Sequence, residues 1–254
     1  MKDSICIPSL FGGRTFREAV RCIAHYGFDT AEIWDWTGLD IPEAQEVLGE
    51  NSVSLAGMCT TEFRLTDGAY RDAYLKGVEE SCEAGKKLGI RFLISQVGPD
   101  TGAPREEQHE NIVKTLELAG PVASSYGLSL LIEPLNTYFD HPGYYLTTSG
   151  EGAAIVRETG CTGIRMLFDI YHQQIMEGNL IPNIKENLDV IAHFHAAGHP
   201  GRHELSSGEV DYQRVFRAIR ELGYKDYIGL EYFPELPPEQ SLTEFRREYI
   251  TPLL

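Results

Sequence analysis

Residues 165–172 read RMLFDIYH, a mostly apolar run that leads into Asp169. Three other stretches in the second half of the chain share this form, with an apolar run followed at once by a carboxylate or an imidazole. They are SLLIEPLN (129–136, with Glu133), AHFHAAG (192–198, with His195) and IGLEYFP (228–234, with Glu231). The four polar residues are 36, 26 and 36 positions apart, about the length of one βα unit. This spacing predicts four consecutive parallel strands, each followed by a helix.

Short β-like runs alternate with amphipathic helical segments over the rest of the chain as well. The expected strands are 4–7, 30–33, 52–57, 91–95, 129–132, 164–168, 191–194 and 227–230. The expected helices are 15–25, 41–50, 70–88, 105–126, 149–159, 180–187, 212–222 and one within 242–249. Eight βα units at a spacing of about thirty residues predict a single (β/α)8 TIM barrel that spans residues 1–254 as one domain. A doubly wound open sheet is the alternative, but residues 11–14 (FGGR) lack its glycine-rich phosphate loop.

Composition narrows the range of partners and compartments. The 254 residues include 38 Asp and Glu but only 22 Lys and Arg, which gives a formal charge of -16. Because nucleic acids and anionic membranes are bound mainly through basic residues, we expect neither as a partner. The N-terminal MKDSICIPSL is too polar for a signal peptide, and no run approaches the about 18 apolar residues of a membrane span. The five cysteines form no CxxC spacing, so we expect free thiols and a cytoplasmic protein.

The four strand-end residues should meet at one point. In a barrel, consecutive strands are neighbours and their C-terminal ends face one mouth. Two Glu, one Asp and one His make a mainly oxygen site, which favours Mg2+ or Mn2+ and is also compatible with Zn2+ or Co2+. A lone carboxylate at a strand end is more often a helix cap or an ion-pair partner. Four ligand-type residues at the ends of four successive strands favour a metal site.

The second half of the chain resembles the xylose-isomerase-like barrel superfamily, in its sugar isomerase/epimerase branch, and most of all the hydroxypyruvate isomerase family. The matching motifs are IEPLN (132–136), HPGYYL (141–146), FDIYHQQIMEGNL (168–180), PGRHE (200–204), GEVDY (208–212) and GLEYFP (229–234). In the first half only AEIW (31–34) is familiar. Trp34 and Trp36 are candidates for the wall of the pocket, although large aromatic residues more often lie in a core.

The resemblance implies that Glu133, Asp169, His195 and Glu231 bind the metal. It also implies that Glu133 and Glu231 are acid/base partners, one taking a proton from a carbon and the other giving one to its neighbour. The metal would stabilise the cis-enediolate between these steps. Carboxylates suit this task if their pKa values are raised toward neutrality, which a closed apolar mouth would do.

Two more residues are implied to bind substrate. His172, expected in a loop over the mouth, resembles the family's substrate-oxygen histidine; the alternative is a solvated loop histidine. Arg202 resembles its substrate-binding arginine, and the planar guanidinium suits a carboxylate. The alternative for Arg202 is a surface ion pair with Glu204. The other histidines, His193 among them, have no comparable motif, so we expect structural or solvated roles for them.

The pattern departs from the family in ways that leave the substrate open. Hydroxypyruvate isomerases often carry Gln where His195 stands, and His there is more typical of sugar 3-epimerases. Those epimerases place a further acid at the position of Phe139, whereas here Asp140 lies one step beyond. The leading hypothesis is an isomerase that interconverts hydroxypyruvate and tartronate semialdehyde or similar small hydroxy-carbonyl compounds. A ketose 3-epimerase is the second.

Two further hypotheses come from other classes. A DNA-repair endonuclease of the related abasic-site type would need several metals, more histidines and a basic surface, so the net charge argues against it. A non-catalytic binding protein on the same barrel would not need paired glutamates. A homo-oligomer stays open, because no interface signal decides it.

Overall fold

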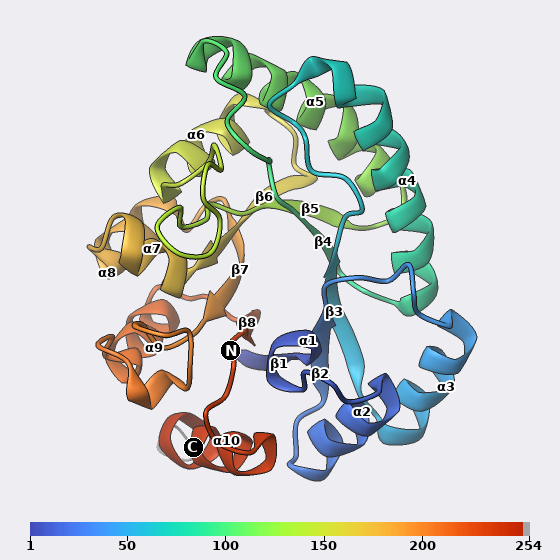
Figure 1. Ribbon diagram of the computed structural model, residues 1–254, viewed down its shortest axis with the longest axis vertical. Helices are drawn as coiled ribbons and strands as arrows, with labels where there is room; N and C mark the ends of the chain where they lie inside the picture. Colours follow the sequence, from blue (N-terminus) through green and yellow to red (C-terminus); the bar gives the residue numbers. More distant parts are fainter. Residues whose placement is uncertain (251–254) are drawn as a thin grey trace.

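A closed parallel barrel forms the centre of the molecule (Figure 1). The computed structural model describes residues 1–250. Strand β1 (Lys2–Cys6) pairs in parallel with both β2 and β8, which closes the sheet, and the strands follow one another around the barrel in chain order. The others are β2 (Thr30–Ile33), β3 (Ser54–Cys59), β4 (Phe92–Ser95), β5 (Ser129–Ile132), β6 (Ile164–Asp169), β7 (Ile191–Ala196) and β8 (Tyr227–Leu230). The predicted (β/α)8 TIM barrel is confirmed, and the open sheet is wrong.

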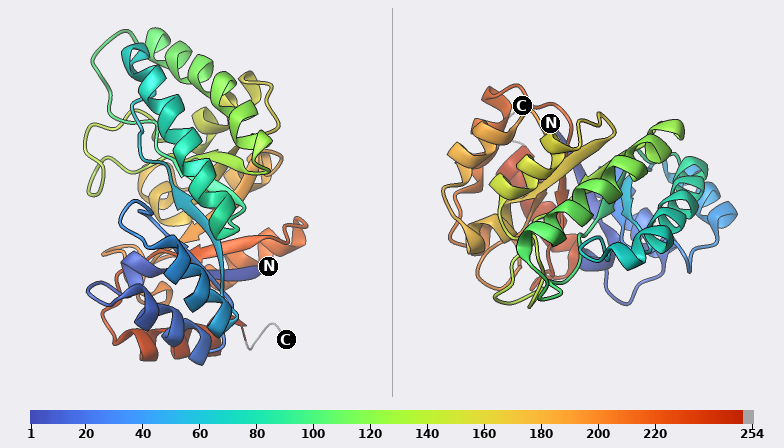
Figure 2. Two further views of the ribbon diagram at one scale, coloured as in Figure 1. Left: turned by 90° about the vertical axis from the view of Figure 1, so that its right-hand side faces the viewer. Right: turned by 90° about the horizontal axis from the view of Figure 1, so that it is seen from above.

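The helices form an outer layer around the strands, as both views of Figure 2 show. They are α1 (Ile7–Leu10), α2 (Phe16–His25), α3 (Ile41–Asn51), α4 (Arg71–Leu88), α5 (Arg105–Ser125), α6 (Ser149–Glu158), α7 (Ile170–Met176), α8 (Leu180–Asn187), α9 (Tyr212–Glu221) and α10 (Pro238–Phe245). Three short turns of other helix types are Gly68–Tyr70, Leu205–Ser207 and Arg246–Ile250. Within residues 1–250, none of these helices is long and apolar enough to cross a membrane.

Most helix boundaries agree with the sequence prediction, and the exceptions have local causes. Thr15 caps α2 through a capping box with Glu18. Helix α10 begins at Pro238, earlier than predicted, because proline suits the first position of a helix. The short helix α7 was not predicted. It begins directly after β6 because the carboxylate of Asp169 accepts the backbone N–H groups of Tyr171 and His172.

Two clusters of buried apolar side chains pack against the strands of the barrel. The larger lies between strands and helices, and a smaller cluster of Ala56, Phe92, Ile94, Leu131, Leu167 and Tyr227 lies apart from it. Because side chains alternate along a strand, these residues come from the other face of the sheet, which is the barrel interior. The packed interior is a rigid base for the rim above it.

Strand register brings the polar strand ends together. Asp169 on β6 is the register partner of His195 on β7, which in turn is the partner of Gly229 on β8. Ile132 on β5 pairs with Met166, so Glu133 continues β5 at the same rim. The predicted convergence of four successive strands follows from this register.

Candidate functional site

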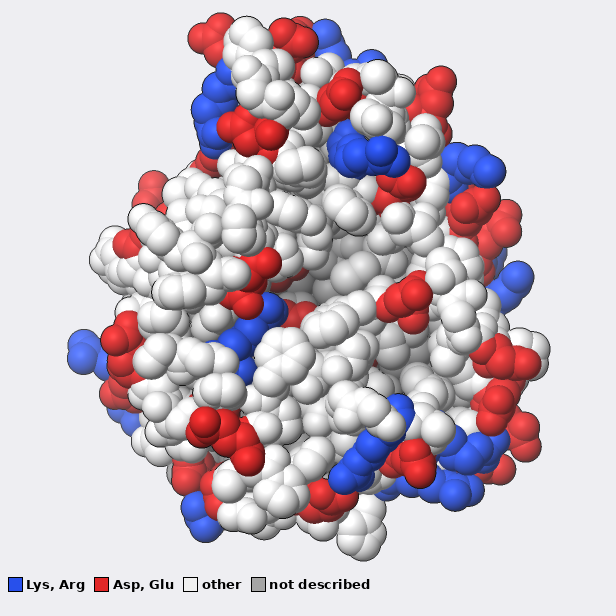
Figure 3. Space-filling view, viewed as in Figure 1, with Lys and Arg blue, Asp and Glu red and all other residues white. Residues whose placement is uncertain are grey.

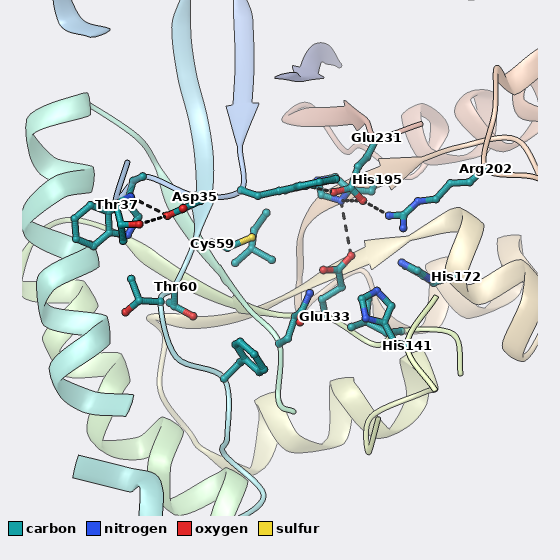
Figure 4. Close-up of a pocket in the computed structure, with 17 residues that line it drawn as sticks. Asp35, Thr37, Cys59, Thr60, Glu133, His141, His172, His195, Arg202 and Glu231 are labelled. Carbon is teal, nitrogen blue, oxygen red and sulfur yellow. Dashed lines mark hydrogen bonds and ion pairs between the residues drawn. The ribbon is translucent and has the colours of Figure 1, made fainter. Parts of the chain in front are cut away.

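A cavity of about 530 Å3 opens at this rim. In the space-filling view, the face of the molecule is hollowed near its centre (Figure 3). Its lining comprises Trp34, Asp35, Trp36, Thr37, Cys59, Thr60, Thr61, Phe63, Ile94, Gln96, Glu133, Leu135, His141, His172, His195, Arg202 and Glu231. Figure 4 shows Glu133, His195, Glu231 and Arg202 grouped on one side, while Asp35 and Thr37 lie on the other. The cavity therefore has one end crowded with charged groups and a partly aromatic remainder, where Asp35 is the one carboxylate among the described lining residues.

The four residues predicted from the strand ends lie together. Each of Glu133, Asp169, His195 and Glu231 offers one ligand-type atom, and these atoms all lie within 4.8 Å of one another. All four side chains are buried, with exposed fractions between 0% and 7%. Nδ1 of His195 lies 3.3 Å from Oε2 of Glu231 and 3.7 Å from Oε1 of Glu133. The geometric part of the sequence prediction is thus met.

Several atoms of this group have no hydrogen-bond partner among the described residues. They are Oε1 of Glu133, Oδ2 of Asp169 and Nδ1 of His195. An unpaired buried polar atom costs about 1–3 kcal/mol, so three in one place point to a missing partner. One divalent cation would bind all three, and the oxygen-rich set suits such an ion. The residues present therefore fit a metal.

The charges of the group are unbalanced without a cation. Burial, reinforced by Glu133 and Glu231, raises the pKa of Asp169 to about 7 although Arg202 and His195 oppose the shift. Burial acts in the same direction on Glu231, but His195 and Arg202 outweigh it and hold the pKa of that carboxyl well below its usual range. The expectation of raised glutamate pKa values is wrong for Glu231, because two cationic groups contact it.

A further carboxylate contacts His195 at Nε2, the nitrogen that faces away from Glu133 and Glu231. Its Nε2 lies 3.0 Å from Oε2 of Glu32, and Nε2 of His193 lies 3.1 Å from Oε1 of the same residue. Burial would raise the pKa of Glu32, but His193 and His195 outweigh it and lower that pKa far below 4.5. Glu32 is therefore a buried carboxylate ion.

His172 lies in the cavity wall but not in a loop. It belongs to α7 and is 1% exposed, so both the expected loop and the solvated alternative are wrong. The helix starts at the strand end because Asp169 caps it, and this carries His172 into the rim. Its Nε2 faces Oδ2 of Asp169 at 3.5 Å and has no hydrogen-bond partner among residues 1–250. A substrate oxygen could accept from it.

Arg202 also lies at the cavity and does not pair with Glu204. Its Nη2 is 2.5 Å from Oε2 of Glu231, and its Nη1 is 3.4 Å from Oδ1 of Asp140. The surface-pair alternative is wrong because Glu204 instead accepts the backbone N–H groups of residues 235 and 236. Arg202 has φ 59°, a left-handed conformation that is uncommon outside glycine. The tight loop after β7 thus directs the guanidinium inward.

Sequence reasoning missed some members of the site. Glu32 lies inside β2 rather than at a strand end, so the spacing argument could not find it. Nε1 of Trp34 donates to Oε1 of Glu231 at 2.6 Å, which makes Trp34 part of the wall and not of the core. Both residues belong to AEIW, the one familiar motif of the first half, and that was the available signal. His141 also lines the cavity.

Comparison with known proteins places the chain. Residues 20–249 match the family described as xylose isomerase-like TIM barrel. The chain belongs to this family. The barrel, the ordered C-terminal motifs and the strand-end residues described above are the features on which the resemblance rested, and the resemblance is confirmed.

Named relatives of this xylose isomerase-like barrel include isomerases. The hydroxypyruvate isomerase of Escherichia coli K12 is 28% identical over 251 residues, which covers 95% of this chain and 97% of the relative. A putative hydroxypyruvate isomerase of Homo sapiens is 34% identical over 180 residues, covering 68% and 65%. A 2-oxo-tetronate isomerase of Cupriavidus necator is 39% identical over 132 residues, about half of each chain (52% and 50%).

Solved structures share the fold. A Brucella melitensis protein described as AP endonuclease, family 2, superposes with a TM-score of 0.93 at 23% identity, covering 98% of this chain and all of that one. The 3-keto-D-glucoside 4-epimerase of E. coli superposes with a TM-score of 0.85, also at 23% identity, covering 97% of this chain and 99% of that one. At these identities the likeness concerns the fold alone.

Proposed function

We propose that this protein is a metal-dependent isomerase of a small hydroxy-carbonyl compound, such as the pair hydroxypyruvate and tartronate semialdehyde. One observation carries the proposal: three buried carboxylates and an imidazole bring ligand-type atoms to one point of a cavity that also contains Arg202, and Glu133, Asp169 and His195 each have an unpaired atom there. The names of the relatives agree with it.

In this proposal Glu133, Asp169, His195 and Glu231 hold one divalent cation, with Mg2+ or Mn2+ favoured over Zn2+ or Co2+. When bound, the ion would polarise the carbonyl of the substrate and stabilise the negative charge of the cis-enediolate. The charge count supports a divalent ion. With His195 neutral, as a metal ligand must be, three carboxylates facing one guanidinium leave a surplus of two negative charges.

Glu133 and Glu231 act as the acid/base pair of the proposal. One takes a proton from the hydroxyl-bearing carbon, and the other delivers a proton to the former carbonyl carbon. The hydroxyl oxygen also loses its proton and the former carbonyl oxygen gains one, so the compound is isomerised without gain or loss of atoms. Glu133 is better placed to take the first proton, because Glu231 is already held by two donors. Both oxygens of Glu231 are engaged, Oε1 by Trp34 and Oε2 by Arg202.

Arg202 and His172 bind the substrate in this scheme. Arg202 is the one Lys or Arg among the described residues that line the cavity, so it is the group that can neutralise a substrate carboxylate. Nε2 of His172 donates to a substrate oxygen. With a single Lys or Arg among the described lining residues, in a chain of charge -16, the cavity gives no support to a phosphodiester or phosphosugar substrate.

The size of the cavity favours a second candidate, a ketose 3-epimerase or another isomerase of free sugars. A three-carbon acid would fill only part of about 530 Å3, a volume typical of sites for larger ligands. The end away from Glu231 is lined by Asp35, Thr37, Thr60 and Thr61 and by the aromatic residues Trp36 and Phe63. Such a lining suits a hydroxylated chain.

A substrate panel followed by NMR in D2O tests the proposal. Hydroxypyruvate, longer 2-oxo acids and free ketoses are incubated with protein that was treated with EDTA and then given Mg2+ or Mn2+. We expect carbon-bound deuterium to appear with at least one compound, only after a metal is restored. Glu133→Gln and Glu231→Gln should each stop the exchange, whereas Glu235→Gln, at an exposed loop position, should not. Exchange that persists in both glutamine variants would refute the two-glutamate mechanism.

A further inference from the structure

Glu32, His193 and His195 form a buried cluster below the rim. Glu32 belongs to β2 and the two histidines belong to β7, strands that are not neighbours in the barrel, so the contact crosses the interior. The three residues are 2%, 0% and 2% exposed. His193 packs against Phe92 with ring centroids 4.5 Å apart. Burying the charge of Glu32 costs free energy unless its partners compensate for it.

Hydrogen-bond chemistry fixes how His195 is turned. A carboxylate ion only accepts hydrogen bonds, so the Nε2 atoms of His193 and His195, at 3.1 and 3.0 Å from Glu32, must both carry a proton. A neutral imidazole has one protonated nitrogen. A metal-binding imidazole is neutral, so in that role His195 would have its lone pair on Nδ1, which faces Glu133 and Glu231 at 3.7 and 3.3 Å.

The backbone makes room for this cluster at two glycines. A Cβ at Gly229 would lie 2.6 Å from Cδ2 of His195 and 2.7 Å from Oε1 of Glu32. A Cβ at Gly57 would lie 2.2 Å from the ring of Phe92, the ring that packs on His193. A larger residue at either position would displace the groups that make the cluster.

Strand irregularities also occur beside the cluster. The β2–β3 register shifts between Ala31 and Glu32, and the β6–β7 register shifts between Met166 and Leu167, where Leu167 is the partner of His193. Such irregularities redirect side chains and are common next to functional sites. Both shifts place a member of the cluster at the point where pairing changes.

We propose that Glu32 and His193 are a positioning pair, which holds His195 with Nδ1 toward the rim and strengthens its binding of a divalent cation. The inference rests on the proposed metal site. Glu32 fixes the tautomer of His195 and makes its imidazole a stronger donor, and His193 holds Glu32 in place by sharing both of its oxygens. Neither residue touches the substrate in this account.

The rival interpretation is a second cation inside the cluster itself. Glu32, His193 and His195 also offer three ligand-type atoms close together. In the described residues, however, the Nε2 atoms are already paired with Glu32 at hydrogen-bond distances of 3.0 to 3.2 Å. These contacts satisfy both Nε2 atoms and both oxygens of Glu32 without an ion, so the positioning role is favoured, and metal stoichiometry separates the two.

Titration of metal-free protein with Mn2+, followed by electron paramagnetic resonance, tests the inference. We expect one ion per chain in the wild type and an affinity about 10- to 100-fold weaker in Glu32→Gln, the usual effect of losing such a partner. His193→Phe should weaken binding less, since Glu32 still contacts His195. Glu158→Gln is the matched control, because it removes a carboxylate that lies 2.7 Å from a surface histidine, His109. It should bind Mn2+ like the wild type.

Further readouts keep the test decisive. The melting temperature of each metal-free variant shows whether that variant folds. A second measurement needs no variant: long-range 1H–15N NMR of the zinc-loaded wild type shows which nitrogen of His195 carries the proton. We expect Nε2–H. Unchanged affinity in Glu32→Gln, a proton on Nδ1, or two ions in the wild type with one in Glu32→Gln would each overturn the inference. A wild type that binds no Mn2+ would instead refute the proposed function.

Discussion

The backbone N–H of Asn136 donates to Nδ1 of His172 at 3.2 Å. A backbone N–H group only donates a hydrogen bond, so Nδ1 of His172 is unprotonated and the proton of the neutral imidazole is on Nε2. Burial, reinforced by the charge of Arg202, lowers the pKa of His172 well below 6.5, which keeps the ring neutral at physiological pH. His172 is therefore a fixed neutral donor whose Nε2 faces Asp169, one of the four clustered residues.

Removing that donor should affect turnover much more than metal binding. We expect His172→Leu to lower kcat by about 100-fold, the usual loss when one hydrogen bond to a developing oxyanion is removed. Mn2+ affinity should change little, since His172 is not among the four clustered residues. Steady-state kinetics and Mn2+ titration measure the two effects, with His109→Gln on the surface as the control. Wild-type turnover in His172→Leu would show that His172 does not bind the reacting oxygen.

Arg202 should distinguish substrates with a carboxylate from those without one. Its guanidinium is bonded to Glu231 and lies 5.3 and 5.8 Å from the rings of Tyr171 and Phe233, so its place at the charged end of the cavity is well defined. We expect Arg202→Ala to lower kcat/KM for a 2-oxo acid at least 100-fold, as the loss of a buried charge-assisted bond of about 3 kcal/mol implies. For a free ketose the loss should be smaller.

The measurement is a pair of kcat/KM ratios, variant to wild type, for one acidic and one neutral substrate of similar length. Arg202→Lys should rescue the acidic substrate only in part, because an ammonium group cannot bind both oxygens in the manner of a planar fork. Equal losses on both substrates would mean that Arg202 acts through Glu231 and not through a substrate carboxylate.

The fold was predictable because its signals are local and repeated. Apolar runs of strand length recur eight times, and caps such as Thr15 and Gly89 mark where helices begin and end. Helix α7 was missed because Asp169 was interpreted only as the acid at the end of a strand. In the structure the same residue is also the N-cap of α7.

The site was predictable only where it follows the strand ends. Glu133, Asp169, His195 and Glu231 share one position in the βα repeat, so spacing alone could group them. Glu32 contacts His195 from 163 residues away across the barrel interior. No periodicity reports such a contact. Asp140 was noted only as a departure from the epimerase pattern, because its contacts with Tyr171 and Arg202, 31 and 62 residues away, follow no periodicity either.

Far from the cavity, Asp3 on β1 carries an electrostatic cost that depends on pH. Burial raises its pKa to about 6, although the N-terminus, Arg246 and Arg220 oppose the shift. In the unfolded chain the carboxyl has its ordinary pKa near 3.8. The folded state therefore binds more protons between these values. This group contributes no cost when it is protonated at low pH; the cost grows as pH rises from about 3.8 to about 6 and stays constant above that.

Asp3→Asn should accordingly stabilise the protein at neutral pH but not in acid. We expect a gain of about 1–2 kcal/mol in the free energy of unfolding at pH 7.5, less than the full shift would give because Asp3 is partly exposed and its cationic neighbours are lost as partners. The gain should shrink between pH 6 and 4, where the wild-type carboxyl becomes protonated. Urea unfolding at several pH values measures it, with the exposed Asp72→Asn as control. A gain that is constant over pH, or a loss at pH 7.5, would show that Asp3 is stabilised by its cationic neighbours and not penalised by burial.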